Sequence, residues 1–268
     1  IEDVWPEAKI AFLKLFDFLE NHLYLKGPEI IPYRYFYMSL ITYFFESSSP
    51  NYDFLKKYFW FYSFHNDNLL SNTTHLRNHI DFLNREKSGK IVAFDRFLID
   101  RHRLRTSSYS SRGRLSRAIL SLLANQGPRG WANPDKRVLL EVYYLLTDKP
   151  NLHHIFPRNF VINNPGKNKL DYNSLMNIAY LPQITNLKIS DENPVTYVRN
   201  YDSPAFEEIM DTHLLPREIL NWARENTMPE NALDIFIERR VDMLIEALKQ
   251  RLQGINFEVI DTQEMEIE

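Results

Sequence analysis

Cysteine is absent from the 268 residues, so the chain can form neither disulfides nor thiolate metal sites. Any bound metal must therefore be held by histidine, asparagine or carboxylate side chains. Glycine is scarce, with 7 residues against 18 phenylalanines and 15 tyrosines, which disfavours a glycine-looped nucleotide fold or a turn-rich β-sandwich. This composition predicts a mainly α-helical protein that packs through aromatic side chains.

Long apolar runs are also missing. The longest, residues 35–45, is interrupted by Ser39 and Thr42 and is far shorter than the roughly 20 residues that span a bilayer. We therefore expect no association with a membrane and a cytoplasmic location. The chain begins at Ile1 and carries no signal-peptide pattern, and we interpret it as a piece of a longer protein.

The net charge of −3 argues against indiscriminate nucleic-acid binding, but the charges are distributed unevenly. A basic segment lies between Asp95 and Trp131, and an acidic tail begins at Asn256. The arginines of the basic segment are Arg96, Arg101, Arg103, Arg105, Arg112, Arg114, Arg117 and Arg129. Two interpretations stay open: contact with a phosphate backbone, chiefly through Arg112, Arg114 and Arg117, or an exposed face or interface.

Apolar periodicity and end signals predict helices along most of the chain. The expected helices cover residues 5–23, 33–45, 54–64, 72–83, 114–125, 135–146, 203–210, 216–225 and about 231–253. Residues 152–182 lack a long helical period, and their short apolar pieces 155–156, 160–162 and 178–181 predict strands and turns. Glycines and prolines in residues 127–134 favour a boundary between a helical domain, 1–131, and a second domain, 132–268.

A histidine pair lies in residues 151–157, which have the sequence NLHHIFP. Hydrolysis of a phosphodiester needs a base to take a proton from water and a cation to neutralise charge on the phosphoryl oxygens. Neighbouring side chains on an extended segment point to opposite faces. His153 and His154 could therefore divide these duties, one holding a metal and the other acting as the base.

Two asparagines follow at a suitable spacing. Asn177 lies in residues 175–181 (LMNIAYL), and Asn186 lies in residues 185–189 (TNLKI). An asparagine side chain can hold a loop by bonding backbone groups, and its amide oxygen is a suitable ligand for Mg²⁺. Either asparagine taken alone is also typical of a turn or a helix cap.

Together these segments resemble the HNH nuclease module DUF1524, which often follows a ParB-like DUF262 domain in GmrSD-type modification-dependent restriction enzymes. The resemblance is carried by residues 153–157 (HHIFP), 177–182 (NIAYLP), 185–190 (TNLKIS) and 193–197 (NPVTY). Residues 31–33, residues 58–61 and the basic segment resemble the helical region that joins the two domains. The likeness thus covers most of the chain, with its specific motifs in residues 151–197.

The resemblance implies a helical bundle with an embedded ββα-metal unit, also called a His-Me finger, that cuts DNA in a restriction or phage-defence system. Its implied partners are DNA and an absent N-terminal ParB-like domain. In the implied roles, His154 is the general base, Asn177 shapes its loop, and His153 and Asn186 bind the metal. Arg158 and Lys188 lie where phosphate contacts are implied.

The implied cofactor is a divalent metal, with Mg²⁺ the first choice. In the family the first position of the pair is commonly acidic, whereas this sequence has His153. An imidazole ligand weakens the preference for Mg²⁺ and also admits Mn²⁺, Ni²⁺ or Zn²⁺.

Alternatives of other classes remain. The chain could be a helical interaction or DNA-docking module with little catalytic activity, whose nuclease site has lost its metal, or its substrate could be RNA. The histidine pair could be a purely structural feature of a strand and turn. His75 and His79, at i and i+4, could chelate a metal, but without a third ligand nearby we expect them on a solvated helix face.

Overall fold

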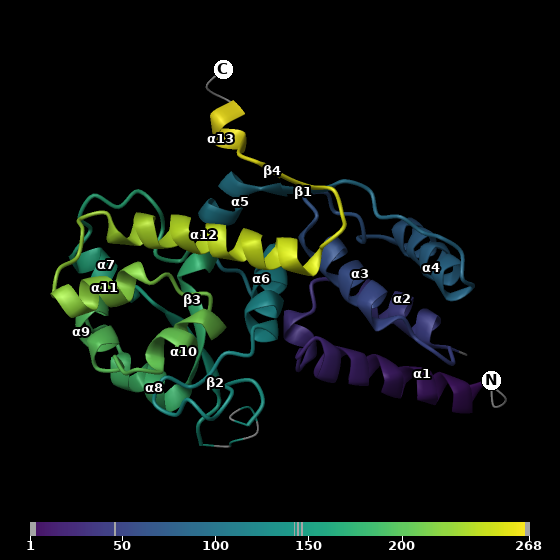
Figure 1. The fold of residues 1–268 in the computed structure, drawn as a ribbon, viewed down its shortest axis with the longest axis horizontal. Helices are drawn as coiled ribbons and strands as arrows, with labels where there is room; N and C mark the ends of the chain where they lie inside the picture. The colour runs from purple at the N-terminus through teal and green to yellow at the C-terminus, as the bar shows by residue number, and fades with distance from the viewer. Residues whose placement is uncertain (1–3, 46, 142, 144, 146, 266–268) are drawn as a thin grey trace. The chain divides into compact units, whose positions relative to one another are not determined.

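The computed structural model describes residues 4–45, 47–141, 143, 145 and 147–265, and it is mainly helical, with a few short strands (Figure 1). No helix in these ranges is long and apolar enough to cross a membrane. The chain forms two compact units, each built from several segments. Unit 1 consists of residues 1–100, 112–121 and 248–260, and unit 2 of residues 101–111, 122–247 and 261–268. Two helices contribute residues to both units, so the units are not separated at one position along the chain. The domain boundary expected near residue 131 therefore stays a prediction.

Unit 1 is built around aromatic helices. Its elements are α1 (Trp5–Asp17), the π-helical turn η1 (Phe18–His22), the short 3-10 helix η2 (Pro28–Ile30), α2 (Tyr35–Phe44), α3 (Tyr52–Phe64), α4 (Thr73–Lys87), β1 (Phe97–Asp100), the first two turns of α6 (Arg114–Asn125) and β4 (Phe257–Ile260). Helix α2 packs against both α1 and α4 (Figure 1). β1 and β4 pair in parallel, with Phe97 opposite Phe257.

Side-chain caps fix the starts of two of these helices. The Oδ1 atom of Asn51 accepts from the Phe54 N–H at 3.2 Å, and that of Asn72 accepts from the His75 N–H at 2.8 Å. Each cap satisfies an N–H group that the first turn of a helix leaves without an intrahelical partner. Helix α3 is buried along most of its length, as its aromatic sequence predicts.

Unit 2 contains a β-hairpin surrounded by helices. Its elements are α5 (Arg101–Thr106), β2 (Pro150–His154), α7 (Arg158–Asn163), the 3-10 helix η3 (Leu175–Asn177), β3 (Ile178–Pro182), α8 (Gln183–Ile189), α9 (Pro194–Arg199), α10 (Phe206–Thr212), α11 (Glu218–Glu225), most of α12 (Ala232–Arg251) and α13 (Thr262–Met265). β2 and β3 pair antiparallel with His153 opposite Ala179, and α8 begins directly after β3.

Most of the expected helices are present, with ends that differ by a few residues. The expected helix over residues 5–23 changes from α-helical to π-helical hydrogen bonding at Phe18. The helix expected over residues 114–125 matches α6, and the long helix expected after Asn231 is α12. The mainly helical fold class is therefore confirmed.

The helix expected over residues 135–146 is wrong for the part of it that the structure describes. Those residues form turns, while residues 142, 144 and 146 lie outside the described ranges. Gly130 N–H donates to the Lys136 carbonyl at 2.8 Å, and Val138 N–H donates to the Pro128 carbonyl at 2.7 Å. These bonds tie the segment to the preceding loop and use backbone groups that a helix would need.

Two smaller expectations also fail. Residues 160–162 lie in α7 instead of a strand, because the Pro157 carbonyl accepts from Val161 N–H at 3.0 Å and starts a helical turn. His79 is 5% exposed, so it does not lie on a solvated face. Its Nδ1 atom lies 2.8 Å from the Tyr58 hydroxyl and its Nε2 atom lies 3.0 Å from the Leu69 carbonyl, which explains its burial.

Candidate functional site

The hairpin and the helix after it bring together residues that are far apart in the sequence. His153 and His154 end β2, and the antiparallel register sets them opposite Ala179 and Ile178 of β3. Asn186 lies in α8, 33 residues after His153. Because α8 begins directly after β3, Asn186 lies beside His153.

His153 and Asn186 are in direct contact. The Nδ1 atom of His153 lies 2.7 Å from the Oδ1 atom of Asn186. The ring is 3% exposed and contacts Tyr197 edge-to-face at 5.8 Å between centroids. Its Nε2 atom is buried without a hydrogen-bond partner among the described residues, so this ring has unused polar capacity in the interior.

His154 makes different contacts. Its Nε2 atom lies 3.4 Å from the Oδ1 atom of Asn173, and its ring meets Tyr172 edge-to-face at 6.4 Å. The neighbouring histidines therefore have different hydrogen-bond and ring partners, as side chains that leave a strand in opposite directions should. If Nε2 carries the proton that faces Asn173, the Nδ1 atom of His154 keeps a lone pair that can accept a proton.

Asn177 holds the loop that follows the histidine pair. Its side chain is fully buried, accepts from Phe156 N–H at 2.8 Å, and donates to the carbonyls of Phe156 at 2.9 Å and Tyr172 at 2.7 Å. The carbonyl of Asn177 also accepts from Ile155 N–H at 2.8 Å. These four bonds tie Asn177 to the loop after β2.

A cavity of about 280 Å³ joins these groups. Its lining residues are Leu152, His153, His154, Pro157, Arg158, Asn186, Leu187, Ser190 and Asp191. Ser190 has a φ angle of 49°, in the region that favours glycine, and this bend ends α8. His154 and Asn186 thus face one common cavity rather than separate sides of the unit.

The donor set can be compared with the needs of a divalent metal. Two ligand atoms that each bind an ion at about 2.1 Å, with an angle of about 90° between the bonds, lie about 3 Å apart. The Nδ1 atom of His153 and the Oδ1 atom of Asn186 are separated by a similar distance, 2.7 Å. Asp191 adds a carboxylate to the cavity wall, although its Oδ2 atom accepts from Asn159 at 2.7 Å. The described residues hold no cluster of three or more histidine, aspartate and glutamate side chains suited to a metal. In this structure the two atoms of His153 and Asn186 are hydrogen-bonded to each other, and an ion held by them alone would need water or substrate oxygen to complete its coordination.

Burial keeps both histidines neutral at neutral pH. Desolvation lowers the pKa of His153 to about 4, although the bond with Asn186 opposes this shift. Desolvation also lowers the pKa of His154, although the contact with Asn173 raises it. A neutral imidazole is the form that binds a metal or accepts a proton, so each ring is in the form its predicted role needs.

The predicted phosphate contacts are distributed over three places. Arg158, at the start of α7, lines the cavity and lies over the Tyr172 ring at 5.8 Å. Lys188 is exposed on α8 and does not line the cavity. The remaining three predicted contacts, Arg112, Arg114 and Arg117, line another cavity, in unit 1.

Three residues of this site were not predicted from the sequence: Asn173, Tyr197 and Arg240. Arg240 of α12 is 2% exposed and donates to the carbonyls of Met176 at 2.6 Å and Ile178 at 2.7 Å, which flank Asn177. It also donates to the carbonyls of Leu214 and His213, each at 3.0 Å. The interruption of the apolar face of a long helix by a basic residue was the signal for such a role.

Comparisons of the chain with protein-family models, with curated proteins and with solved structures found no match. The assignment of a function therefore rests on the motif residues and on the geometry of the hairpin, α8 and their cavity.

Proposed function

We propose that β2, the loop held by Asn177, β3 and α8 form a one-metal HNH nuclease site of the ββα-metal type, which hydrolyses phosphodiester bonds in DNA. The observation that carries this proposal is the 2.7 Å contact between His153 and Asn186 beside a cavity that His154 also lines. A strand histidine and a helix amide that meet in this way supply the nitrogen and oxygen donors that the resemblance assigns to the metal.

In this mechanism His154 takes a proton from the attacking water. Its neutral ring can do so at neutral pH because burial lowers its pKa. Asn173, 3.4 Å from Nε2, orients the ring, and Asn177 keeps the loop after the strand in shape. Arg158 offers a cation at the cavity wall for a neighbouring phosphate.

His153 and Asn186 would hold the divalent cation, with Mg²⁺ as the first candidate and Mn²⁺, Ni²⁺ or Zn²⁺ as alternatives admitted by the imidazole. When bound, the cation neutralises negative charge that develops on the phosphoryl and leaving oxygens. DNA is the proposed substrate, and target choice would belong to a ParB-like domain of the same protein.

The test is nicking of supercoiled plasmid by the chain and by His154→Ala, with Mg²⁺ or Mn²⁺ after removal of metals with a chelator. We expect the substitution to reduce the nicking rate by a factor of about 100 or more, because it removes the general base. A matched control is His75→Ala, since His75 lies outside the cavity, and its rate should stay within about twofold of the unsubstituted chain. Equal nicking by His154→Ala and the unsubstituted chain would refute the assigned base.

The second candidate is a docking module without catalytic activity, and it is favoured by the amide at Asn186 in place of a stronger ligand. Calorimetry with Mn²⁺ separates the two functions. Binding that Asn186→Ala weakens supports the nuclease, whereas a folded chain that binds no Mn²⁺ supports docking. A parallel reaction with single-stranded RNA tests whether the chain cuts RNA as well as, or instead of, DNA.

A further inference from the structure

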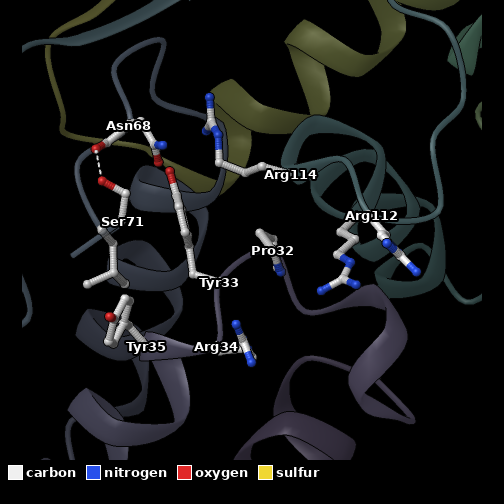
Figure 2. Close-up of a pocket in the computed structure, with 10 residues that line it drawn as sticks. Pro32, Tyr33, Arg34, Tyr35, Asn68, Ser71, Arg112 and Arg114 are labelled. Carbon is white, nitrogen blue, oxygen red and sulfur yellow. Dashed lines mark hydrogen bonds between the residues drawn. The ribbon is translucent and has the colours of Figure 1, made fainter. Parts of the chain in front are cut away.

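Unit 1 contains a cavity of about 560 Å³ whose wall is rich in arginine (Figure 2). It is lined by Pro32, Tyr33, Arg34, Tyr35, Asn68, Leu70, Ser71, Arg112, Arg114 and Arg117. The four guanidinium groups come from two distant segments, and none of the described lining side chains is a carboxylate. The wall therefore concentrates positive charge that its own residues do not neutralise.

Two helices begin at this cavity. Arg34 is the N-terminal cap residue of α2, which has 10 residues, and Arg114 is the first residue of α6, which has 12 residues. The N-terminal end of a helix carries a partial positive charge and exposes N–H groups that favour anions. Both helix ends add to the positive potential of the four arginines.

Parts of the wall are fixed in place before any ligand binds. Arg114 donates to the carbonyls of Ser63 at 3.0 Å and His65 at 3.1 Å, and its guanidinium lies 5.6 Å from the centre of the Tyr33 ring. Tyr33 is 7% exposed, and the Ser71 hydroxyl donates to the Asn68 carbonyl at 3.4 Å (Figure 2). A wall held in this way loses little conformational entropy when it binds a ligand.

Two other arginines are available to a ligand. The side chains of Arg34 and Arg112 are exposed, and within the described part of the chain neither makes an ion pair or a side-chain hydrogen bond. Figure 2 shows Arg34, Arg112 and Arg114 around Pro32 and Tyr33. A guanidinium presents several N–H donors in a plane that matches two phosphate oxygens, so this arrangement suits phosphoryl groups.

We propose that this cavity is a phosphate-binding site for a ligand that presents two or more phosphoryl groups, with Arg34 and Arg112 as the residues that engage them. A volume of about 560 Å³ lies within the usual range for ligand pockets, about 300–1,000 Å³. Tyr33 and Tyr35 supply aromatic surface beside the cations. The proposal does not depend on the nuclease assignment, because none of its residues lines the cavity around His154.

Phosphoryl groups of this kind come either from a free polyphosphate or nucleotide or from the backbone of a nucleic acid. The test is calorimetric titration of the chain, in metal-free buffer, with inorganic pyrophosphate, adenosine triphosphate and a single-stranded oligodeoxythymidine. The test variant is the double substitution Arg34→Ala and Arg112→Ala. The matched control is Arg77→Ala with Arg85→Ala, which removes the same charge from exposed positions of α4 in the same unit.

We expect the unsubstituted chain to bind at least one probe, the test variant to bind it at least tenfold more weakly, and the control to stay within about twofold. Binding of pyrophosphate or the triphosphate identifies a free ligand, and binding of the oligonucleotide alone identifies the nucleic-acid backbone. Failure of all three probes to bind overturns the proposal, and so does equal weakening in both double variants. Melting temperatures of the variants verify that unit 1 remains folded.

Discussion

At the scale of single residues, Asn177 supplies hydrogen bonds that an irregular loop cannot make within its own backbone. Its side-chain amide accepts from the N–H group of Phe156 and donates to the carbonyls of Phe156 and Tyr172. Replacement by alanine leaves these three groups without that partner in a buried place, so we expect Asn177→Ala to lower the free energy of unfolding by about 2–4 kcal/mol. Circular dichroism should then report a melting temperature about 5–15 °C lower.

The control for this prediction is Asn163→Ala, at an exposed asparagine at the end of α7. Its effect should stay within about 0.5 kcal/mol. Equal melting temperatures for Asn177→Ala and the unsubstituted chain would show that the loop does not depend on the amide.

The pH dependence of the proposed cleavage follows from His154. Burial lowers the pKa of this ring below its ordinary value of 6.5, and only the neutral ring can take a proton from water. As pH rises, the rate should therefore increase through a midpoint below 6.5 and then level off. Initial rates of plasmid nicking between about pH 5 and 8 measure this midpoint. A midpoint above 7 would contradict His154 as the base in this environment.

The residues of the candidate site differ in how far the sequence alone identified them. The sequence singled out His153, His154, Asn177 and Asn186 by their residue types and spacing, whereas their roles, and the choice of Arg158, came from the resemblance to the nuclease module. Asn173 and Tyr197 were not assigned roles, because their contacts depend on how distant segments fold back. An asparagine near a turn and a tyrosine in a helix have ordinary structural uses, so nothing local distinguished them.

At the scale of secondary-structure elements, the prediction succeeded where local signals and tertiary packing agree. Helix α6 has the expected ends because apolar periodicity and the following Gly127 and Pro128 indicate the same boundaries. The turns of residues 135–141 were missed because the segment bonds to residues 128–130, which sequence periodicity does not report. Hydrogen bonds to the preceding loop, 6 and 10 positions away in the sequence, therefore account for the largest error.

Helix α12 is connected to the site loop by Arg240. Burial lowers the pKa of this guanidinium to about 9, so it stays charged at neutral pH, and its partners are four backbone carbonyls. Arg240→Met keeps an apolar stem but leaves those carbonyls buried without their donor. We expect the free energy of unfolding to fall by roughly 3 kcal/mol or more, measured by urea denaturation.

The neighbouring residue offers a matched control for this element. Arg239 pairs with Glu218 at 2.9 Å, and its side chain is 61% exposed. An exposed ion pair contributes little, so Arg239→Met should change the free energy of unfolding by less than about 1 kcal/mol. If Arg240→Met is no more damaging than Arg239→Met, the buried carbonyl bonds do not stabilise unit 2.

At the scale of the whole molecule, three buried histidines predict sensitivity to mild acid. Burial lowers the pKa of His79, His153 and His213 to about 4 each, from 6.5. Between these values the unfolded chain binds protons that the folded chain does not, so the free energy of unfolding falls as pH drops below about 6.5. Each histidine contributes up to about 1.4 kcal/mol per pH unit.

Urea denaturation at pH 7, 6 and 5, at constant ionic strength, measures this loss. Most carboxylates gain protons nearer pH 4, so the change between pH 6.5 and 5 reports mainly on histidine. The same free energy of unfolding at pH 7 and pH 5 would show that these three rings are not neutral in the folded chain.

The position of Arg240 in the sequence also sets an order of events during synthesis. Met176 precedes it by 64 residues, so the carbonyls around Asn177 leave the ribosome well before the guanidinium that binds them. In a nascent chain that lacks α12, the carbonyls of Met176 and Ile178, beside the strand that carries both histidines, do not yet have their donor. Under the proposed function, such a chain would acquire its cutting site only after α12 has been synthesised, which would protect nearby nucleic acid during the preceding part of translation.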